Sequence, residues 1–274
     1  SERNSVMVLE SILNPRNASD KPWHVFVIAF LYTLVAIVVA HQLFPSQSSI
    51  LSIALITILF VPFFQKLFEL EERKEDAAAQ KRLNKNLLTR HSASIMIFSA
   101  FFLGVVVAGT FAFMFLPVDN AFSLQTSTLK AISGNILEPT TFSNIFLNNT
   151  QVMMLMFILS AIFGAGAVFI LAWNASVISV FVGLFTESLT TQGLGTTAAF
   201  IVGVPVGLST LALHGVPEIV AYFVAGLAGG ILSVGLIREN YRSAEFKLIL
   251  KDALVFMAFA ELLIIVAAFL EVIV

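Results

Sequence analysis

The chain has 274 residues, of which 58% are hydrophobic and only 12% charged, and its mean hydropathy is +0.94. Soluble domains carry roughly 25% charged residues, so the composition excludes a soluble domain and predicts an integral membrane protein. The net charge of −2, without a basic patch interleaved with aromatic residues, excludes a nucleic-acid surface. The absence of cysteine excludes disulfides, thiolate metal sites and cysteine nucleophiles.

Five apolar stretches are long enough to cross the hydrocarbon core of a bilayer, which needs about 20 helical residues. In chain order we expect spans at 23–44, 50–68, 95–116, 152–173 and 248–274. The first 22 residues contain basic residues but no apolar core. We therefore expect no signal peptide there.

Basic residues set the predicted orientation of the spans. Of the 15 Lys and Arg residues, 14 lie in the segments 1–22, 66–90 and 238–251, and only Lys130 lies elsewhere. The positive-inside rule places these three segments in the cytoplasm and the loop 117–149 outside the cell membrane. An odd number of crossings must then connect residue 149 to residue 238.

The stretch 175–237 is interrupted near Thr190 and again near His214. If 216–237 is a complete span, the pieces before it must together make one net crossing. The predicted architecture is therefore an all-α, polytopic transmembrane helical bundle. It has about seven net crossings and a broken or re-entrant helix between Ala175 and Leu213. The C-terminus then lies outside.

Two regions follow from this pattern: a two-span N-terminal extension, 1–90, and a transmembrane core, 91–274. The segment 66–90 is rich in helix formers, and Glu69 and Arg73 lie four residues apart. We therefore expect the second span to continue into the cytosol as a charged helix. A merely solvated helix and a docking surface for a partner are both open interpretations.

Polar and ionisable residues inside spans are costly in lipid, so each is a candidate functional residue. The candidates are Asn174, Glu187, His214, Glu218 and Glu261. Glu261 lies nine residues after Asp252, which by helical rise is about 14 Å further along the last span, near mid-membrane. We expect Glu261 to bond with a neighbouring helix, and Glu187 to reach water at the end of its helix.

The segment His214-Gly215-Val216-Pro217-Glu218 predicts the start of a new helix. Gly215 permits a tight turn, and Pro217 suits the first helical turn, where its missing N–H costs nothing. Glu218 would then lie beside unsatisfied N–H groups at the positive end of the helix dipole. His214 would cap the same turn or face Glu218.

His214 and Glu218 are thus expected to form the polar centre of the fold, with Asn174 or Glu187 as partner of the imidazole. A single histidine and a single carboxylate make an incomplete zinc shell, so no bound metal and no cofactor are predicted. The patterns H-E-x-x-H and G-x-S-x-G are absent. The sequence therefore favours a protein without catalytic activity, with an intramembrane hydrolase as a second alternative.

Three motifs from Asn148 onward resemble the stage II sporulation protein M family in its archaeal form. They are Asn148-Asn149, Phe163-Gly-Ala-Gly-Ala-Val-Phe-Ile-Leu-Ala-Trp-Asn174-Ala and Leu213-His214-Gly215-Val-Pro-Glu218-Ile. The opening Leu9-Glu-Ser-Ile-Leu-Asn-Pro-Arg resembles the N-terminal extension of archaeal members. The family usually has proline before the histidine, where this chain has Leu213. The resemblance implies a helical membrane fold and, by likeness to bacterial members, a scaffold that localises partner proteins.

The leading functional hypothesis is therefore a membrane scaffold or assembly factor with a membrane-protein partner or a second copy of itself. The alternative is a small-molecule or ion transporter or channel with a polar cavity at His214 and Glu218. A water-accessible polar cavity at mid-membrane would favour transport. A solid bundle with a wide apolar side face would favour the scaffold.

Overall fold

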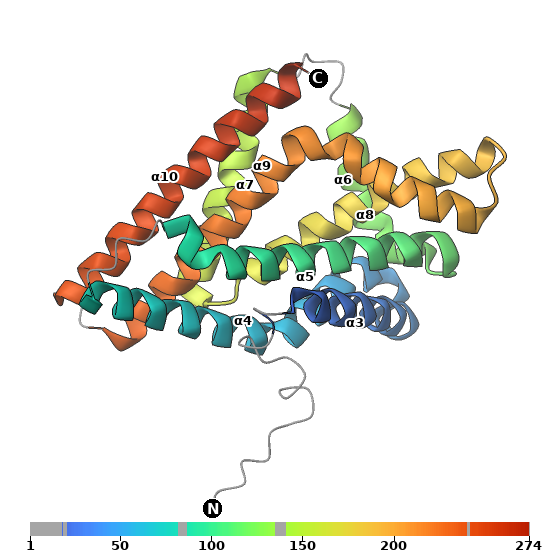
Figure 1. The fold of residues 1–274 in the computed structure, drawn as a ribbon. Helices are drawn as coiled ribbons and strands as arrows, with labels where there is room; N and C mark the ends of the chain where they lie inside the picture. Colours follow the sequence, from blue (N-terminus) through green and yellow to red (C-terminus); the bar gives the residue numbers. More distant parts are fainter. Residues whose placement is uncertain (1–17, 19–20, 82–86, 135–140, 240–241, 274) are drawn as a thin grey trace, which may run out of the picture.

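The computed structural model describes residues 18, 21–81, 87–134, 141–239 and 242–273, and no strand occurs in these ranges. The elements are α3 (Pro22–Leu43), η1 (Pro45–Gln47), α4 (Ser48–Lys81), α5 (Leu87–Phe115), η2 (Asp119–Phe122), α6 (Ser123–Gly134), α7 (Phe142–Phe163), α8 (Ala167–Thr191), α9 (Thr196–Arg238) and α10 (Ala244–Ile273) (Figure 1). Seven of these helices are long and apolar enough to cross a membrane. The predicted polytopic helical bundle is therefore confirmed.

Four predicted spans agree with α3, α4, α5 and α10 to within a few residues, apart from charged extensions at the ends of α4 and α5. The second span continues without a break to Lys81, so its predicted charged helical extension is confirmed that far. Residues 82–86 lie outside the described part of the chain. The predicted loop 117–149 contains a further short helix, α6.

The predicted span 152–173 is wrong, because α7 ends at Phe163 and α8 begins at Ala167. The turn between them contains Gly164, whose φ of 63° lies in the left-handed region that a side chain disfavours. Hydropathy alone misses this turn because the residues that make it are themselves small or apolar. Trp173 consequently belongs to the next helix.

The predicted interruption between Ala175 and Leu213 is confirmed at 192–195, where Gly193 has a φ of 101°. The pieces on either side are longer than expected. Residues 175–189 belong to the 25-residue helix α8, and 196–213 form the first part of α9. The interruption is therefore a hairpin turn between two long helices.

The predicted start of a new helix at Val216 is wrong, because α9 runs unbroken for 43 residues and contains both Pro205 and Pro217. By helical rise it is about 64 Å long, roughly twice the thickness of a bilayer core. Figure 1 shows α9 bent near its middle. Pro217 accounts for such a bend, because its ring clashes with the carbonyl of Leu213 and leaves that carbonyl without a helical partner.

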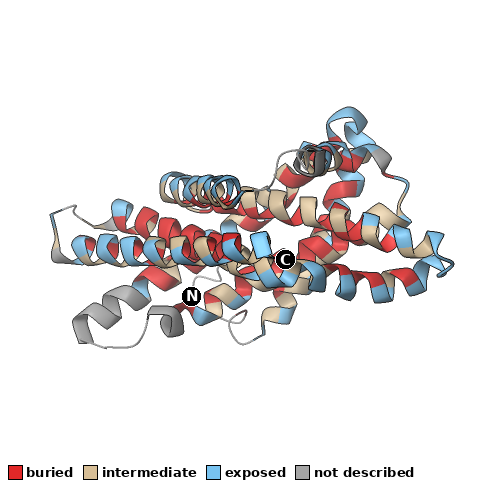
Figure 2. Cartoon of the chain, turned by 90° about the horizontal axis from the view of Figure 1, so that it is seen from above, coloured by how far each residue is buried: buried red, intermediate tan, exposed pale blue. Residues whose placement is uncertain are grey.

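The bundle core lies where α4, α5 and α9 meet, and Figure 2 shows the exposed residues along the outer sides of the helices. Phenylalanine rings fill the seam between α4 and α5; for example, the centroids of Phe60 and Phe101 are 4.7 Å apart. Where the charged ends of α4 and α5 meet, the carboxylate of Glu71 bonds to the imidazole of His91, and both side chains are buried. This pair fixes the charged end of α4 against the core.

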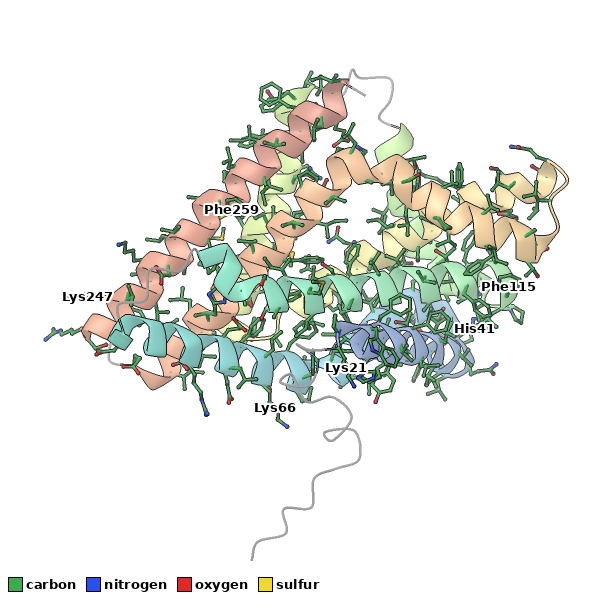
Figure 3. All side chains as sticks on the ribbon, in the orientation of Figure 1. Lys21, His41, Lys66, Phe115, Lys247 and Phe259 are labelled. Carbon is green, nitrogen blue, oxygen red and sulfur yellow. The ribbon has the colours of Figure 1, made fainter. Side chains whose placement is uncertain are left out.

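Three helices near the start of the chain alternate in direction. Figure 3 shows Lys247 at the left and Lys66 at the lower middle, while His41 and Phe115 lie on the right. Helices α3 and α5 run toward the right of this view, and α4 runs back. The distribution of basic residues predicts that successive spans cross the membrane in opposite directions, and the alternating directions of α3, α4 and α5 are compatible with that prediction.

Candidate functional site

Small residues bring α7 and α9 into close contact. A Cβ added to Gly229 would lie 2.8 Å from the Cβ of Ser160 and 3.0 Å from the backbone nitrogen of Ala161. The Ser160 hydroxyl lies 2.7 Å from the backbone carbonyls of both Gly226 on α9 and Gly164, so its one hydrogen is shared between these two acceptors. This approach of the two backbones lays α7 along the second half of α9.

Glu218 is hydrogen-bonded within its own helix. The hydroxyl of Tyr222 donates to Glu218 Oε1 at 2.7 Å, and the same hydroxyl lies 3.4 Å from Asn149 Oδ1 on α7. Since a phenol carries one hydrogen, the shorter contact takes it and Asn149 is a secondary partner. Tyr222 and Asn149 are buried, and Glu218 is half-buried. A carboxylate on α9 is therefore coupled to an amide on α7.

The next residue of α7 bonds to α10. Thr150 donates its hydroxyl to Glu261 Oε1 at 3.0 Å, which confirms that Glu261 bonds with a neighbouring helix. Glu271, near the end of α10, is a further half-buried carboxylate in the vicinity of Glu218 and Tyr222. Successive residues of α7 thus face carboxylates on two different helices. We call Asn149, Thr150, Glu218, Tyr222, Glu261 and Glu271 the three-helix polar cluster.

The residue types in this cluster limit the functions that it can perform. The Thr150–Glu261 bond fixes the register of α7 against α10, whereas the Tyr222–Glu218 bond lies within α9 and reaches α7 only through the contact of Tyr222 with Asn149. Among the described residues, no group of three or more His, Asp or Glu side chains is placed to hold a metal ion. The arrangement therefore supports a polar clamp between helices, and it also places three half-buried carboxylates, groups able to carry a proton, on α9 and α10.

The predicted role of the segment around Pro217 needs correction. Glu218 lies inside a continuous helix, so it is not held by free N–H groups at a helix start. His214 lies one turn before it on the same face of α9, and its buried Nδ1 has no hydrogen-bond partner in the described structure. Gly215 makes no tight turn, because it lies inside the same continuous helix. Of the expected polar centre, only Glu218 joins the three-helix polar cluster.

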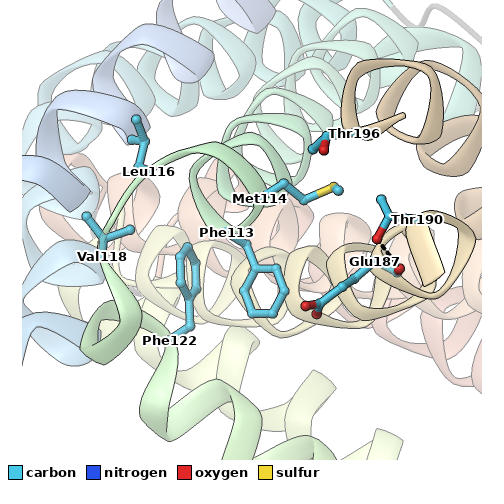
Figure 4. Close-up of a pocket in the computed structure, with 8 residues that line it drawn as sticks. All are labelled: Phe113, Met114, Leu116, Val118, Phe122, Glu187, Thr190 and Thr196. Atoms are coloured by element: carbon cyan, nitrogen blue, oxygen red, sulfur yellow. Dashed lines mark hydrogen bonds between the residues drawn. The ribbon is translucent and has the colours of Figure 1, made fainter. Parts of the chain in front are cut away.

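Asn174 and Glu187 do not serve as partners of His214. Asn174 donates its amide to the backbone carbonyl of Ile170 at 2.8 Å, within α8. Glu187 is exposed near the end of α8, where it lines a separate pocket with Phe113 and Thr190 (Figure 4). Glu187 thus reaches the surface as expected, far along α8 from the family-like motifs.

Four cluster residues were missed as candidate site residues. Tyr222 lies four residues after Glu218, a spacing that places both on one helical face, so helical periodicity was a usable signal. Thr150 follows the asparagine pair directly, and Glu271 is a carboxylate in an otherwise apolar stretch. Asn149 was noticed as part of a motif, but its partner on another helix has no signature in the sequence.

The family comparison covers the region that holds the cluster. Residues 97–274 match the family model described as Stage II sporulation protein M. The matched region includes the whole of α7, α8, α9 and α10. No curated protein and no solved structure matches the chain.

Proposed function

Because this chain belongs to the stage II sporulation protein M family, we propose that it is a non-catalytic membrane scaffold that assembles or positions another membrane protein. The partner is a second membrane protein or another copy of this chain. We further propose that it resides in the cell membrane with its N-terminus in the cytoplasm and its C-terminus outside, following the distribution of basic residues.

One observation carries this proposal: the cavity beside the bend of α9 is apolar. This cavity of about 470 Å³ adjoins Gly215 and Val216, yet only Ser99 and Ser209 among its lining residues have polar side chains. A water or ion path needs polar groups to replace the hydration shell of the solute. An apolar cavity next to the family-like motif therefore favours a packed scaffold over a conduit.

The transport alternative rests on the three-helix polar cluster. Glu218, Glu261 and Glu271 are all half-buried, and carboxylates at membrane depth are typical of proton relays. The partnerless Nδ1 of His214 lies one helical turn from Glu218. A proton-coupled transporter would use these carboxylates as carriers, whereas a scaffold would use them as helix clamps.

Photo-crosslinking in native membranes tests the scaffold role. A photoreactive amino acid is placed at Leu262 on α10 or at Leu31 on α3, both apolar and more than half exposed at 55% and 52%. A scaffold should give a discrete crosslinked protein at one of these positions. The buried Ala253 is the matched control, since a probe there reaches only the chain itself.

Measuring proton and solute flux after reconstitution into proteoliposomes tests the transport alternative. A scaffold should show no proton or solute flux above empty vesicles, and Glu218→Gln should leave its crosslinking intact. Flux that Glu218→Gln abolishes, together with lipid-only crosslinks at Leu31 and Leu262, would replace the scaffold with a transporter.

A further inference from the structure

The pocket at the far ends of α5 and α8 has a composition suited to an organic cation. It measures about 400 Å³ and lies between the end of α5, the turn η2, the end of α8 and the start of α9. Its lining combines one carboxylate, Glu187, with the rings of Phe113 and Phe122. Figure 4 shows the Glu187 carboxylate directed toward the Phe113 ring.

The Phe113 ring is held in place from two sides. It meets Phe122 edge to face, with centroids 5.6 Å apart and planes at 71°. It also lies across Gly183 of α8, where an added Cβ would come within 2.6 Å of the ring. Gly183 and Glu187 are one helical turn apart, so the flat surface that seats the ring and the carboxylate beside it share one face of α8.

Charge around the pocket favours a cation. Between Arg90 and Arg238 the chain has a single basic residue, Lys130. In the part of the chain that the structure describes, Glu187 forms no salt bridge; only its backbone carbonyl is engaged, accepting from the Thr190 hydroxyl at 2.7 Å. A carboxylate beside an aromatic face attracts ammonium groups, which interact with the ring quadrupole as well as the charge.

We propose that this pocket binds an alkylammonium group, with Glu187 as the counter-ion and Phe113 as the aromatic contact. The group belongs either to a free amine or quaternary ammonium compound or to the headgroup of a lipid. Met114 and Thr196 complete the wall with one polarisable and one polar side chain. The site lies apart from the three-helix polar cluster, and its occupancy does not depend on the scaffold role.

Equilibrium dialysis of the full chain with radiolabelled choline tests the site. The protein is kept in a maltoside detergent, which has no ammonium group to compete. We expect saturable binding to the wild-type chain that is at least about threefold weaker in Glu187→Gln and about two- to fivefold weaker in Phe113→Leu. Added salt should weaken binding to the wild type more than to Glu187→Gln.

Two controls distinguish binding of choline at this pocket from the loss of any surface carboxylate and from binding by shape alone. Glu245→Gln neutralises another exposed carboxylate, in the first turn of α10, and should bind choline like the wild type. The neutral isostere 3,3-dimethylbutan-1-ol has the shape of choline without its charge and should not displace it. Glu187→Gln changes an exposed side chain, so its thermal unfolding should match that of the wild type.

The source of the ammonium group is distinguished in nanodiscs. If a lipid headgroup fills the pocket, choline binding should fall when phosphatidylcholine is added to phosphatidylglycerol nanodiscs; if the ligand is soluble, it should not change. Absence of saturable choline binding to the wild type, unchanged affinity in Glu187→Gln, or equal displacement by the neutral isostere would each overturn the proposal.

Discussion

Gly229→Ala should destabilise the bundle more than Gly215→Ala, although both substitutions add one methyl group to the same helix. At Gly229 the new Cβ would lie 2.8 Å from the Cβ of Ser160 and nearer still to the carbonyl oxygen of Phe157. At Gly215 its nearest contact would be Leu211, at 3.8 Å. Only the first substitution therefore forces α7 and α9 apart.

The magnitude follows from the contact distances. Carbon atoms pack at about 3.5–4.0 Å, so α7 and α9 must separate by roughly 1 Å at Gly229. Overpacking of this kind costs about 1–3 kcal/mol. Alanine also gains up to about 1 kcal/mol in helix propensity over glycine, but this gain is shared by Gly215→Ala and cancels between the variants. Their free energies of unfolding should therefore differ by about 1–3 kcal/mol.

Unfolding by SDS in mixed micelles, followed by tryptophan fluorescence, measures this difference. Trp173 on the neighbouring helix α8 is half-buried and reports loss of packing. Gly215→Ala should be as stable as the wild type or slightly more stable. Free energies of unfolding that agree to within about 0.5 kcal/mol for Gly229→Ala and Gly215→Ala would refute close packing at Gly229.

Three further predictions concern the cluster and the orientation. Glu218→Gln should be mild in detergent unfolding because an amide oxygen still accepts from the Tyr222 hydroxyl, whereas Glu218→Leu should cost about 1–3 kcal/mol; equal losses would contradict this. A double-mutant cycle of Thr150→Val and Glu261→Leu, each of which removes the hydrogen bond, should give a coupling of about 0.6–1.7 kcal/mol, and additive effects would exclude a bond between α7 and α10 in the membrane. Ser127→Cys, in a chain without native cysteine, should react with impermeant maleimide from outside; labelling only from the cytoplasm would invert the orientation.

Much of the fold was predictable from the sequence because lipid constrains it so strongly. Backbone groups in a bilayer have no water to bond with, so apolar stretches of sufficient length must be helical. The spans that became α3, α4, α5 and α10 followed from this alone. The total of seven membrane-length helices also agrees with the seven predicted crossings, although the chain divides the region after Asn149 differently.

Helix boundaries in the second half depended on tertiary contacts. The sequence around Pro217 resembles a helix start, and in isolation a proline there would end or kink the helix. In the structure α9 continues through Pro217 because both halves pack on neighbours: the first against α5, as at Phe200 with Phe115, and the second against α7 and α10. Local propensity predicted a break, and packing converted it into a bend.

The candidate site, too, was predictable from the sequence only in part. Composition alone identified Glu218 and Glu261 as residues needing partners, because a carboxylate in lipid is costly wherever it lies. Which groups satisfy them depends on how α7, α9 and α10 are rotated about their axes. The close approach of α7 to α9 at Gly229 accompanies the contact of Asn149 with Tyr222, and the packing of α10 against α7 places Glu261 beside Thr150. The sequence determined which side chains require partners, and the tertiary structure decided the partners, since helix rotation is fixed by contacts far apart in the chain.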